Sequence, residues 1–219
     1  MKALFLAFVM FAAQDTPQDI PKSGLPKEAD CVVCMASGQA HGKEKPAAGV
    51  MYRGVAYYFC NVKEAPLFKK DPEAYLPPVL PRPMPDLSST DLAGKVWDAD
   101  SMRGKLVVLD FWATWCGPCK AMFPDLNKLR AKYKDAGFEI LSVNVDDNRK
   151  VFEKYLKGHP FPNPVLHDDG QIFDKWRVRT IPATFLVRDG QVVAQWTGKQ
   201  TFKTFEAAVI ANLPARATP

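Results

Sequence analysis

Five prolines fall within nine consecutive positions in the middle of the chain, at residues 77–85. Proline fixes its own backbone angle and has no N–H group to donate, so this run can form neither a helix nor a central strand. It favours extended polyproline II structure, which acts as a semi-rigid spacer. We therefore predict a linker at residues 77–85 that divides the 219-residue chain into two domains.

The chain begins with Met1-Lys2 and eleven apolar residues, which predicts a signal peptide over residues 1–13. A membrane-spanning helix needs about 20 residues, so this stretch is too short to be one. A buried N-terminal helix or a short membrane anchor is the alternative. Residues 14–29 are polar and proline-rich and are expected to form a flexible leader. We expect an extracytoplasmic, periplasmic or secreted protein that does not span the membrane after signal removal.

The composition is that of a soluble globular protein, with 47% hydrophobic and 24% charged residues. The net charge of +5 is spread along the chain without an arginine-rich strip, so nucleic-acid binding is not expected. Five cysteines are too few for a small disulfide-stapled scaffold. Two C-x-x-C pairs leave one cysteine over, so simple pairing cannot account for all five.

The second domain, residues 86–219, alternates strand and helix patterns. Apolar runs and the hairpin signal Asp189-Gly190 predict strands over residues 105–112, 138–145, 183–188 and 191–197. Apolar residues at helical spacing predict helices after Cys119, over 149–157 and over 201–212. The order β-α-β-α-β-β-α predicts an α/β fold, a mixed sheet flanked by helices.

Cys116 and Cys119 belong to the sharpest motif of the chain, Trp-Cys-Gly-Pro-Cys-Lys. The motif follows a predicted strand and opens a predicted helix, where unpaired N–H groups and the helix dipole stabilise a thiolate. The second sulfur lies one turn further on and can attack a mixed disulfide. A zinc site would need a second ligand pair, which does not follow in this domain. We therefore predict a redox dithiol.

Residues 86–213 resemble the thioredoxin superfamily, and more narrowly the exported TlpA/ResA-like thiol-disulfide oxidoreductases. The resemblance rests on WATWCGPCK, on the preceding VVLDFW and on Thr-Ile-Pro-Ala-Thr-Phe at residues 180–185. It implies a thioredoxin-like fold with Pro182 as a cis-proline facing the disulfide and with substrate bound along Ile181 and Pro182. It also implies protein disulfides as substrates, an upstream electron donor and no cofactor for the dithiol.

Asp110 matches the buried acidic residue of thioredoxin in this resemblance. A buried carboxyl group has a raised pKa, so Asp110 could accept the proton of Cys119 as that cysteine attacks. Its apolar neighbours favour burial over a solvated or salt-bridged aspartate. Trp115 is expected to shield the dithiol and contact substrate. Met122 replaces a glutamate that many TlpA/ResA-like proteins carry, so pH tuning by that glutamate is not expected here.

Residues 30–76 resemble the YHS domain, a small α+β domain linked with copper or zinc. The resemblance rests on a C-x-x-C pair, on Tyr-x-Gly-x-x-Tyr-Tyr-Phe-Cys at residues 52–60 and on Asp-Pro-Glu-Ala-Tyr at residues 71–75. It implies that cysteines hold the metal.

The candidate ligands are Cys31, Cys34 and Cys60, and the fourth cysteine of the family pattern is Glu64 here. The fourth ligand is therefore open between Glu64, His41 and Met35. Thiolates with a thioether favour Cu(I), whereas a carboxylate or imidazole suits zinc. The alternative is a Cys31–Cys34 disulfide, or a domain without metal in which Cys60 is simply buried.

Two functions follow from these domains. The first is an exported reductase of protein disulfides, of the kind that maintains cytochrome c apoproteins or copper-site cysteines. The second is a metal-binding assembly protein in which the first domain handles copper or zinc and the second reduces acceptor cysteines. A peroxidase is disfavoured because no cysteine lies in a T-x-x-C context.

Overall fold

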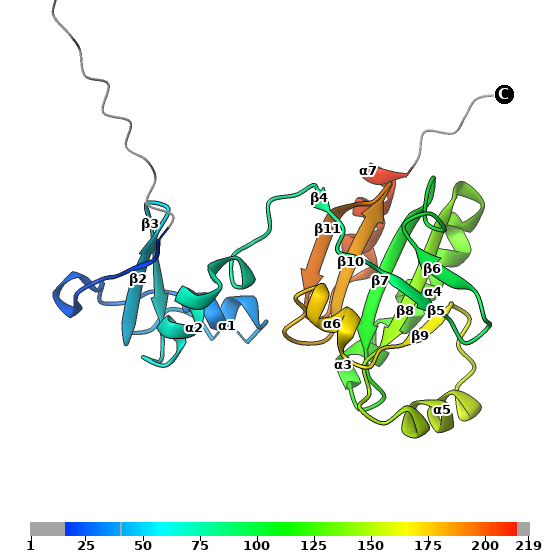
Figure 1. Ribbon diagram of the computed structural model, residues 1–219, viewed down its shortest axis with the longest axis horizontal. Helices are drawn as coiled ribbons and strands as arrows, with labels where there is room; N and C mark the ends of the chain where they lie inside the picture. Colours follow the sequence, from blue (N-terminus) through cyan, green and yellow to red (C-terminus); the bar gives the residue numbers. More distant parts are fainter. Residues whose placement is uncertain (1–15, 40, 214–219) are drawn as a thin grey trace, which may run out of the picture. The chain divides into compact units, whose positions relative to one another are not determined.

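A computed structural model describes residues 16–39 and 41–213, and the predicted signal peptide at residues 1–13 lies outside them. The chain forms two compact units, Met1–Pro77 and Pro78–Pro219, so their boundary falls within the proline run (Figure 1). In the described ranges, none of the helices has the length and apolar character needed to cross a membrane.

The first unit is built on a three-stranded antiparallel sheet with the order β1-β2-β3. Arg53 and Gly54 join β2 and β3 through a turn with positive φ at both positions, which suits the twist of a hairpin. Phe59 and Phe68 are fully buried at the centre of its core. The elements are β1 (Gln18–Asp19), η1 (Lys22–Gly24), α1 (Val32–Ala36), β2 (Ala48–Tyr52), β3 (Val55–Phe59), α2 (Glu64–Lys70) and η2 (Pro72–Ala74).

The structure differs from the flexible leader expected over residues 14–29. β1 pairs with β2, and the Ile20 N–H donates to the Gly49 carbonyl at 2.8 Å. The approach is close, because a Cβ on Gly49 would lie 2.8 Å from Leu25 Cδ2. The open edge of β2 supplies backbone partners that a polar, proline-rich segment can use without an apolar pattern of its own. The described part of this segment therefore belongs to the first unit.

The second unit contains a six-stranded mixed sheet with the order β4-β11-β10-β7-β8-β9. β7, β8 and β9 are parallel, whereas β10, β11 and β4 are added antiparallel. The strands of the unit are β4 (Arg82–Pro83), β5 (Ser88–Thr90), β6 (Val96–Asp98), β7 (Leu106–Trp112), β8 (Phe138–Asn144), β9 (Val165–His167), β10 (Ala183–Arg188) and β11 (Gln191–Thr197).

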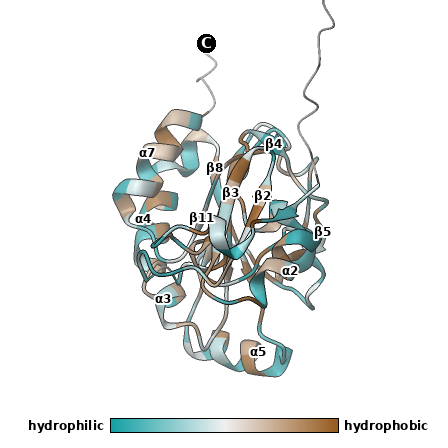
Figure 2. Cartoon of the chain, turned by 90° about the vertical axis from the view of Figure 1, so that its left-hand side faces the viewer, coloured by the Kyte–Doolittle hydropathy of each residue, from teal (hydrophilic) through white to brown (hydrophobic). Residues whose placement is uncertain are grey.

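Every residue of β7 is buried, which places this strand at the centre of the unit. Val107, Leu109 and Phe111 pack in one core cluster, while Leu106 and Val108 pack in another together with residues of α4 and α7. α4 and α7 thus cover one face of the sheet, and Figure 2 shows these two helices side by side. α6 packs on the other face through Ile172, which confirms the predicted α/β fold class (Figure 1). The helices are α3 (Gly117–Lys120), α4 (Phe123–Tyr133), η3 (Lys134–Ala136), α5 (Arg149–Gly158), α6 (Gln171–Lys175) and α7 (Phe202–Asn212).

The predicted linker at residues 77–85 is only partly a spacer. Its second half contains β4, which pairs with the edge strand β11, and the Met84 N–H donates to the Gly190 carbonyl at 2.9 Å. Proline is tolerated here because an edge strand needs hydrogen bonds on one side only. Residues 81–85 are therefore attached to the second unit.

Candidate active site

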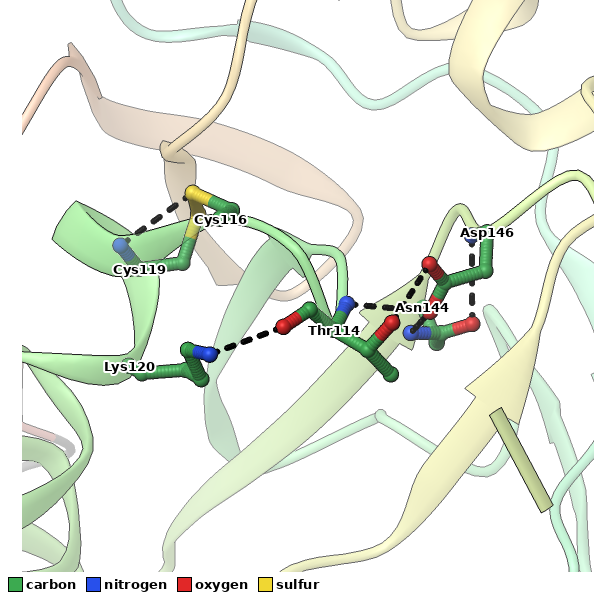
Figure 3. The surroundings of a disulfide bond; sticks show 6 residues. All are labelled: Thr114, Cys116, Cys119, Lys120, Asn144 and Asp146. Atoms are coloured by element: carbon green, nitrogen blue, oxygen red, sulfur yellow. Dashed lines mark hydrogen bonds between the residues drawn. A yellow bond between two sulfur atoms is a disulfide. The ribbon is translucent and has the colours of Figure 1, made fainter. Parts of the chain in front are cut away.

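The predicted redox dithiol lies where β7 leads into α3 (Figure 3). Cys116 is the N-cap residue of α3, and the backbone N–H of Cys119 donates to its Sγ at 3.2 Å. The two sulfurs are joined in a disulfide. Cys116 is 4% exposed and Cys119 is 0% exposed, so Cys116 is the half nearer to solvent. A partner thiol or disulfide therefore meets Cys116 first.

Polar side chains fix the loop that leads from β7 to this disulfide (Figure 3). Asp146 accepts hydrogen bonds from the Thr114 N–H at 3.0 Å and from the Thr114 hydroxyl at 2.9 Å. Asn144 donates to the same carboxylate at 2.8 Å, and Lys120 Nζ donates to the Thr114 carbonyl at 2.9 Å. Because β7 and β8 are parallel, their ends meet at one edge of the sheet. Thr114 is held from both sides as a result.

Asp110 lies inside the sheet on β7, and it is 0% exposed, which confirms its predicted burial. Burial raises the pKa of this carboxyl group to about 7. Neither carboxyl oxygen has a hydrogen-bond partner within the described ranges. A group that titrates near neutral pH can take up and release protons under working conditions. This environment suits a base for Cys119, a role that stays a prediction.

Ile181 and Pro182 come directly before β10, whose first residue, Ala183, pairs with Phe111 near the end of β7. The peptide bond between them is cis, the geometry implied by the resemblance. Ile181 packs against the cluster of buried side chains that includes Cys116 and Cys119. A substrate chain that reached the dithiol would meet this segment, although the predicted substrate contacts of Ile181 and Pro182 stay predictions.

Trp115 immediately precedes the disulfide, and its side chain is 71% exposed. It lines a cleft of about 510 Å³ together with Ile181, Phe173 and Val145. An exposed indole beside a reactive sulfur supplies flat apolar surface and an N–H donor to a partner chain. This placement suits the predicted shielding and substrate-contact role of Trp115.

The remaining cysteines gather in the first unit together with Glu64. The ligand atoms of Cys31, Cys34, Cys60 and Glu64 all lie within 4.8 Å of one another. Cys31 Sγ lies 3.3 Å and Cys60 Sγ 3.5 Å from Glu64 Oε2, and the sulfurs of Cys34 and Cys60 are 3.6 Å apart. All three cysteines are free, so the alternative Cys31–Cys34 disulfide is not formed.

Separate elements bring these four side chains together. Cys31 precedes α1 and Cys34 lies within it, whereas Cys60 follows β3 and Glu64 opens α2. A backbone bridge between Cys31 and Tyr58 ties the α1 end to β3. Burial, and then the neighbouring thiols of Cys34 and Cys31, raises the pKa of Cys60. Three thiols and a carboxylate in this arrangement match the donor types that bind zinc.

His41 and Met35 are the other predicted candidates for the fourth ligand. His41 groups with Glu44 and Cys60 instead of with the full set, and its ring lies 3.6 Å from Glu44 Oε1. The Met35 side chain is 58% exposed. Glu64 is therefore the candidate that joins all three cysteines.

Four further polar residues, for which no role was predicted, lie around the dithiol loop: Thr114, Lys120, Asn144 and Asp146. A usable signal was present, because Asn-Val-Asp ends a predicted strand that runs parallel to the one before the motif. Polar residues at the ends of adjacent parallel strands meet at one edge, so this triplet could have been assigned to the site.

Comparisons with known proteins agree with this geometry. A model of the AhpC/TSA family matches residues 81–196. The thiol-disulfide oxidoreductase ResA of Bacillus anthracis is 37% identical over 124 residues, which cover 56% of this chain and 72% of that protein. ResA of Geobacillus kaustophilus is 37% identical over 124 residues, covering 56% and 71%.

Solved structures show the same fold. A thiol:disulfide interchange protein DsbE from Chlorobium tepidum has a TM-score of 0.57 at 34% identity and covers 61% of this chain and 97% of its own. A thioredoxin family protein from Chlorobium tepidum TLS has a TM-score of 0.55 at 23% identity and covers 63% and 100%. The second unit therefore has the predicted thioredoxin-like fold. Residues 16–77 lie outside the family match, and their likeness to the YHS domain stays a prediction.

Proposed function

We infer the function of this chain from its family, since it belongs to the AhpC/TSA family and, like its ResA relatives, is a thiol-disulfide oxidoreductase. We propose that it works outside the cytoplasm as a reductase of disulfides in protein substrates. The observation that carries this proposal is the Cys116–Cys119 pair. Cys116 is slightly exposed, whereas Cys119 is fully buried near β7, the strand that contains Asp110. The Cys-Gly-Pro-Cys sequence is that of thioredoxin, whose low reduction potential supports the reducing direction.

The reaction proceeds in two exchanges. The Cys116 thiolate attacks one sulfur of the substrate disulfide, so that a mixed disulfide forms and the first substrate sulfur leaves as a thiolate. Cys119 then attacks Cys116 Sγ, forming the intramolecular disulfide and releasing the second substrate sulfur. The proton of the Cys119 thiol passes to the Asp110 carboxylate. The substrate gains two electrons, the dithiol loses two, and an upstream donor must return them.

Equilibration of the protein with glutathione tests the direction. A potential near that of thioredoxin, about −270 mV, is expected for a reductase, whereas a value near about −120 mV would assign it as an oxidant. A Cys119→Ser variant should hold substrates on Cys116 as mixed disulfides, because the resolving sulfur is gone. Cytochrome c apoproteins and proteins with copper-site cysteines are the substrates that we expect it to capture in extracts of the exported fraction.

Export is part of the proposal and is supported by the apolar segment at residues 3–13. Fractionation of cells that make the full chain should recover it outside the cytoplasm with a shortened N-terminus. Recovery of the uncut chain in the cytoplasm would contradict export without changing the assignment of the dithiol.

A second candidate function is metal binding by the first unit. The observation that favours it is the gathering of Cys31, Cys34, Cys60 and Glu64 within 4.8 Å. When bound, a zinc or copper ion would hold together the ends of α1, β3 and α2, or would be passed on to an acceptor whose cysteines the dithiol keeps reduced. The carboxylate favours zinc over Cu(I) in this set.

Metal analysis of the purified full chain tests this function. One equivalent of zinc is expected in the wild-type chain and much less in Cys60→Ser, while a preference for Cu(I) would point to the copper assignment instead. A wild-type chain without metal after reconstitution with either ion would exclude the metal function and leave the reductase untouched.

A further inference from the structure

Asp110 is flanked on both neighbouring strands by a buried hydroxyl side chain. In the register of the sheet, Asp110 on β7 is paired with Ser142 on β8 and with Thr184 on β10. Residues paired across adjacent strands place their side chains on the same face. All three are 0% exposed. Thr184, Asp110 and Ser142 therefore form a buried polar row across the centre of the sheet.

This row lacks partners in the protein. Both carboxyl oxygens of Asp110, Ser142 Oγ and Thr184 Oγ1 have no hydrogen-bond partner within the described ranges. Leaving a buried polar group unpaired costs about 1–3 kcal/mol. Protein interiors satisfy such groups with buried water, which typically makes about three hydrogen bonds. Paired residues have Cβ atoms about 4.5–5.5 Å apart, so their oxygens lie within the span of one bridging water.

The row lies under the buried half of the dithiol. Trp112, two residues beyond Asp110 on the same face of β7, packs in one cluster with Cys119. Val108, two residues before Asp110, packs in another cluster with Met122. The segment from Cys119 to Met122 therefore crosses the position of Asp110. Cys119 is thus the sulfur best placed to exchange a proton with the row.

The buried side chains that pack around the row on this face are otherwise uncharged. The charged groups nearest to them already have partners: Lys120 and Asp146 bond to Thr114, and Glu206 accepts from Tyr133. The side chains from α4 and α7 are apolar at their buried positions, and the partly buried phenols of Tyr133 on α4 and Tyr155 on α5 lie at the edges of the two clusters. Phenols are neutral at pH 7. The hydroxyls of Ser142 and Thr184 are therefore the groups that can stabilise the ionised form of Asp110.

We propose that Ser142 and Thr184 are positioning residues that, with water held between them, stabilise the Asp110 carboxylate as the acceptor of the proton from Cys119. This inference rests on the proposed reductase function. The bridging water takes the proton of the Cys119 thiol and passes one of its own protons to the Asp110 carboxylate. Asp110 holds that proton until the upstream donor reduces the disulfide, and then returns it to the Cys119 thiolate by the same path. No electrons move in this relay, and each member returns to its starting state.

The test follows the titration of the Asp110 carboxyl group by carbon NMR in the oxidised full chain. Hydroxyl donors favour the ionised carboxyl group, so their loss in a Ser142→Ala, Thr184→Val double variant should raise the pKa of Asp110 above its value of about 7. A rise of about one unit would lower the ionised fraction at pH 7 roughly fivefold. The release of glutathione from a Cys116–glutathione mixed disulfide should slow by the same factor at pH 7 and recover at higher pH.

Two further variants separate this relay from packing. Thr184→Ser keeps the hydroxyl and should restore most of the wild-type titration midpoint, whereas Leu186→Val changes packing on the same face of β10 and should leave the midpoint unchanged. An unchanged midpoint in the double variant, or an equal shift in Thr184→Ser, would overturn the proposal. The carboxyl titration needs no substrate, so it stays readable even if the wild-type chain fails to reduce insulin and the proposed function is wrong.

Discussion

Each unit of the molecule combines cysteines with one carboxyl side chain, and the two combinations are built in opposite ways. In the second unit the sulfurs of Cys116 and Cys119 are bonded to each other, while Asp110 has no hydrogen-bond partner among the described residues. In the first unit the cysteines remain free, and Glu64 lies within hydrogen-bond reach of Cys31 and Cys60.

This difference decides what each carboxyl group can do. An isolated, buried carboxyl group holds a proton up to near neutral pH and can exchange it with a thiol in a reaction. A carboxylate that already faces several thiols adds an oxygen donor to a ready set of ligands, as zinc sites require. The same two residue types thus support electron transfer in one unit and, in our proposal, ion binding in the other.

The largest effect should come from replacing one cysteine by serine, either in the dithiol of the second unit or among the free cysteines of the first. Cys116→Ser should lower insulin reduction by at least about a thousandfold, because a serine hydroxyl cannot form the mixed disulfide. Cys60→Ser should leave that rate unchanged if the two groups work independently. Insulin turbidity with dithiothreitol as the donor measures both. A loss of reductase activity in Cys60→Ser would show that the first unit takes part in electron transfer, and would break the comparison.

The next effect concerns the isolated carboxyl group and the pH dependence of folding. The pKa of Asp110 is about 7 in the folded chain, above the ordinary value of about 3.9. Between these values the folded state holds a proton that the unfolded chain has released, so stability falls as pH rises. Asp110→Asn removes this loss, and its stability relative to wild type should improve by up to about 4 kcal/mol from pH 4 to pH 8.

Urea unfolding followed by tryptophan fluorescence measures this change, since all five tryptophans lie in the second unit. Asp91→Asn is the matched control with the opposite sign. Burial raises the pKa of Asp91, but hydrogen bonds from Trp97 and from the Lys95 and Ala93 backbones outweigh it and lower that pKa overall. Relative to wild type, the Asp91→Asn variant should therefore lose stability as pH rises through the acid range. Parallel behaviour of the two variants would contradict the difference that we draw between isolated and bonded carboxyl groups.

A third effect should separate Glu64 from other carboxylates near the cysteines. Glu64→Gln should weaken zinc binding by about a hundredfold, because a neutral amide replaces a charged ligand. Competition with a chromogenic chelator measures this affinity. Glu44→Gln is the control, since Glu44 belongs to the group with His41 and Cys60 and not to the complete set. Equal losses in both variants would place the ion nearer to His41.

The sequence predicted those elements whose signal lies within a continuous stretch of residues. The strand before Cys116 and the hairpin at Asp189-Gly190 were found because their apolar runs and turn residues are continuous in sequence. β9 has only three residues between Pro164 and Asp168, too few for a periodic pattern. β1 forms by pairing with the open edge of β2, and the residues of the expected leader give no sign of this pairing.

The features of the site also separate into those that one strand predicts and those that depend on how several elements pair. Burial of Asp110 followed from its apolar neighbours in one strand, whereas the row with Ser142 and Thr184 depends on the register of three strands that are distant in sequence. The gathering of Glu64 with three cysteines likewise depends on how α1, β3 and α2 meet. Pairing across elements is set by tertiary packing, so composition and spacing alone could not supply it.

The smallest predicted effects are losses of stability when a hydroxyl near each group of cysteines is removed. Thr114→Val removes the bond from the Thr114 hydroxyl to the Asp146 carboxylate and should destabilise the second unit by about 1.5–3 kcal/mol, since the acceptor is charged. Ser37→Ala removes a neutral bond of 3.1 Å to the Cys34 carbonyl and should destabilise the first unit by about 0.5–1.5 kcal/mol. Hydrogen exchange resolves the two units in one sample.

Zinc turns this pair into a test of what holds each group. If an ion ties α1 to β3 and α2, added zinc should stabilise the first unit through binding, in the wild type and in Ser37→Ala alike. Zinc should leave the stability of the second unit unchanged, with or without Thr114→Val, because the grouped ligands lie in the first unit. A first unit whose stability is the same with and without zinc would mean that its cysteines are held by the protein alone, as the disulfide of the second unit is.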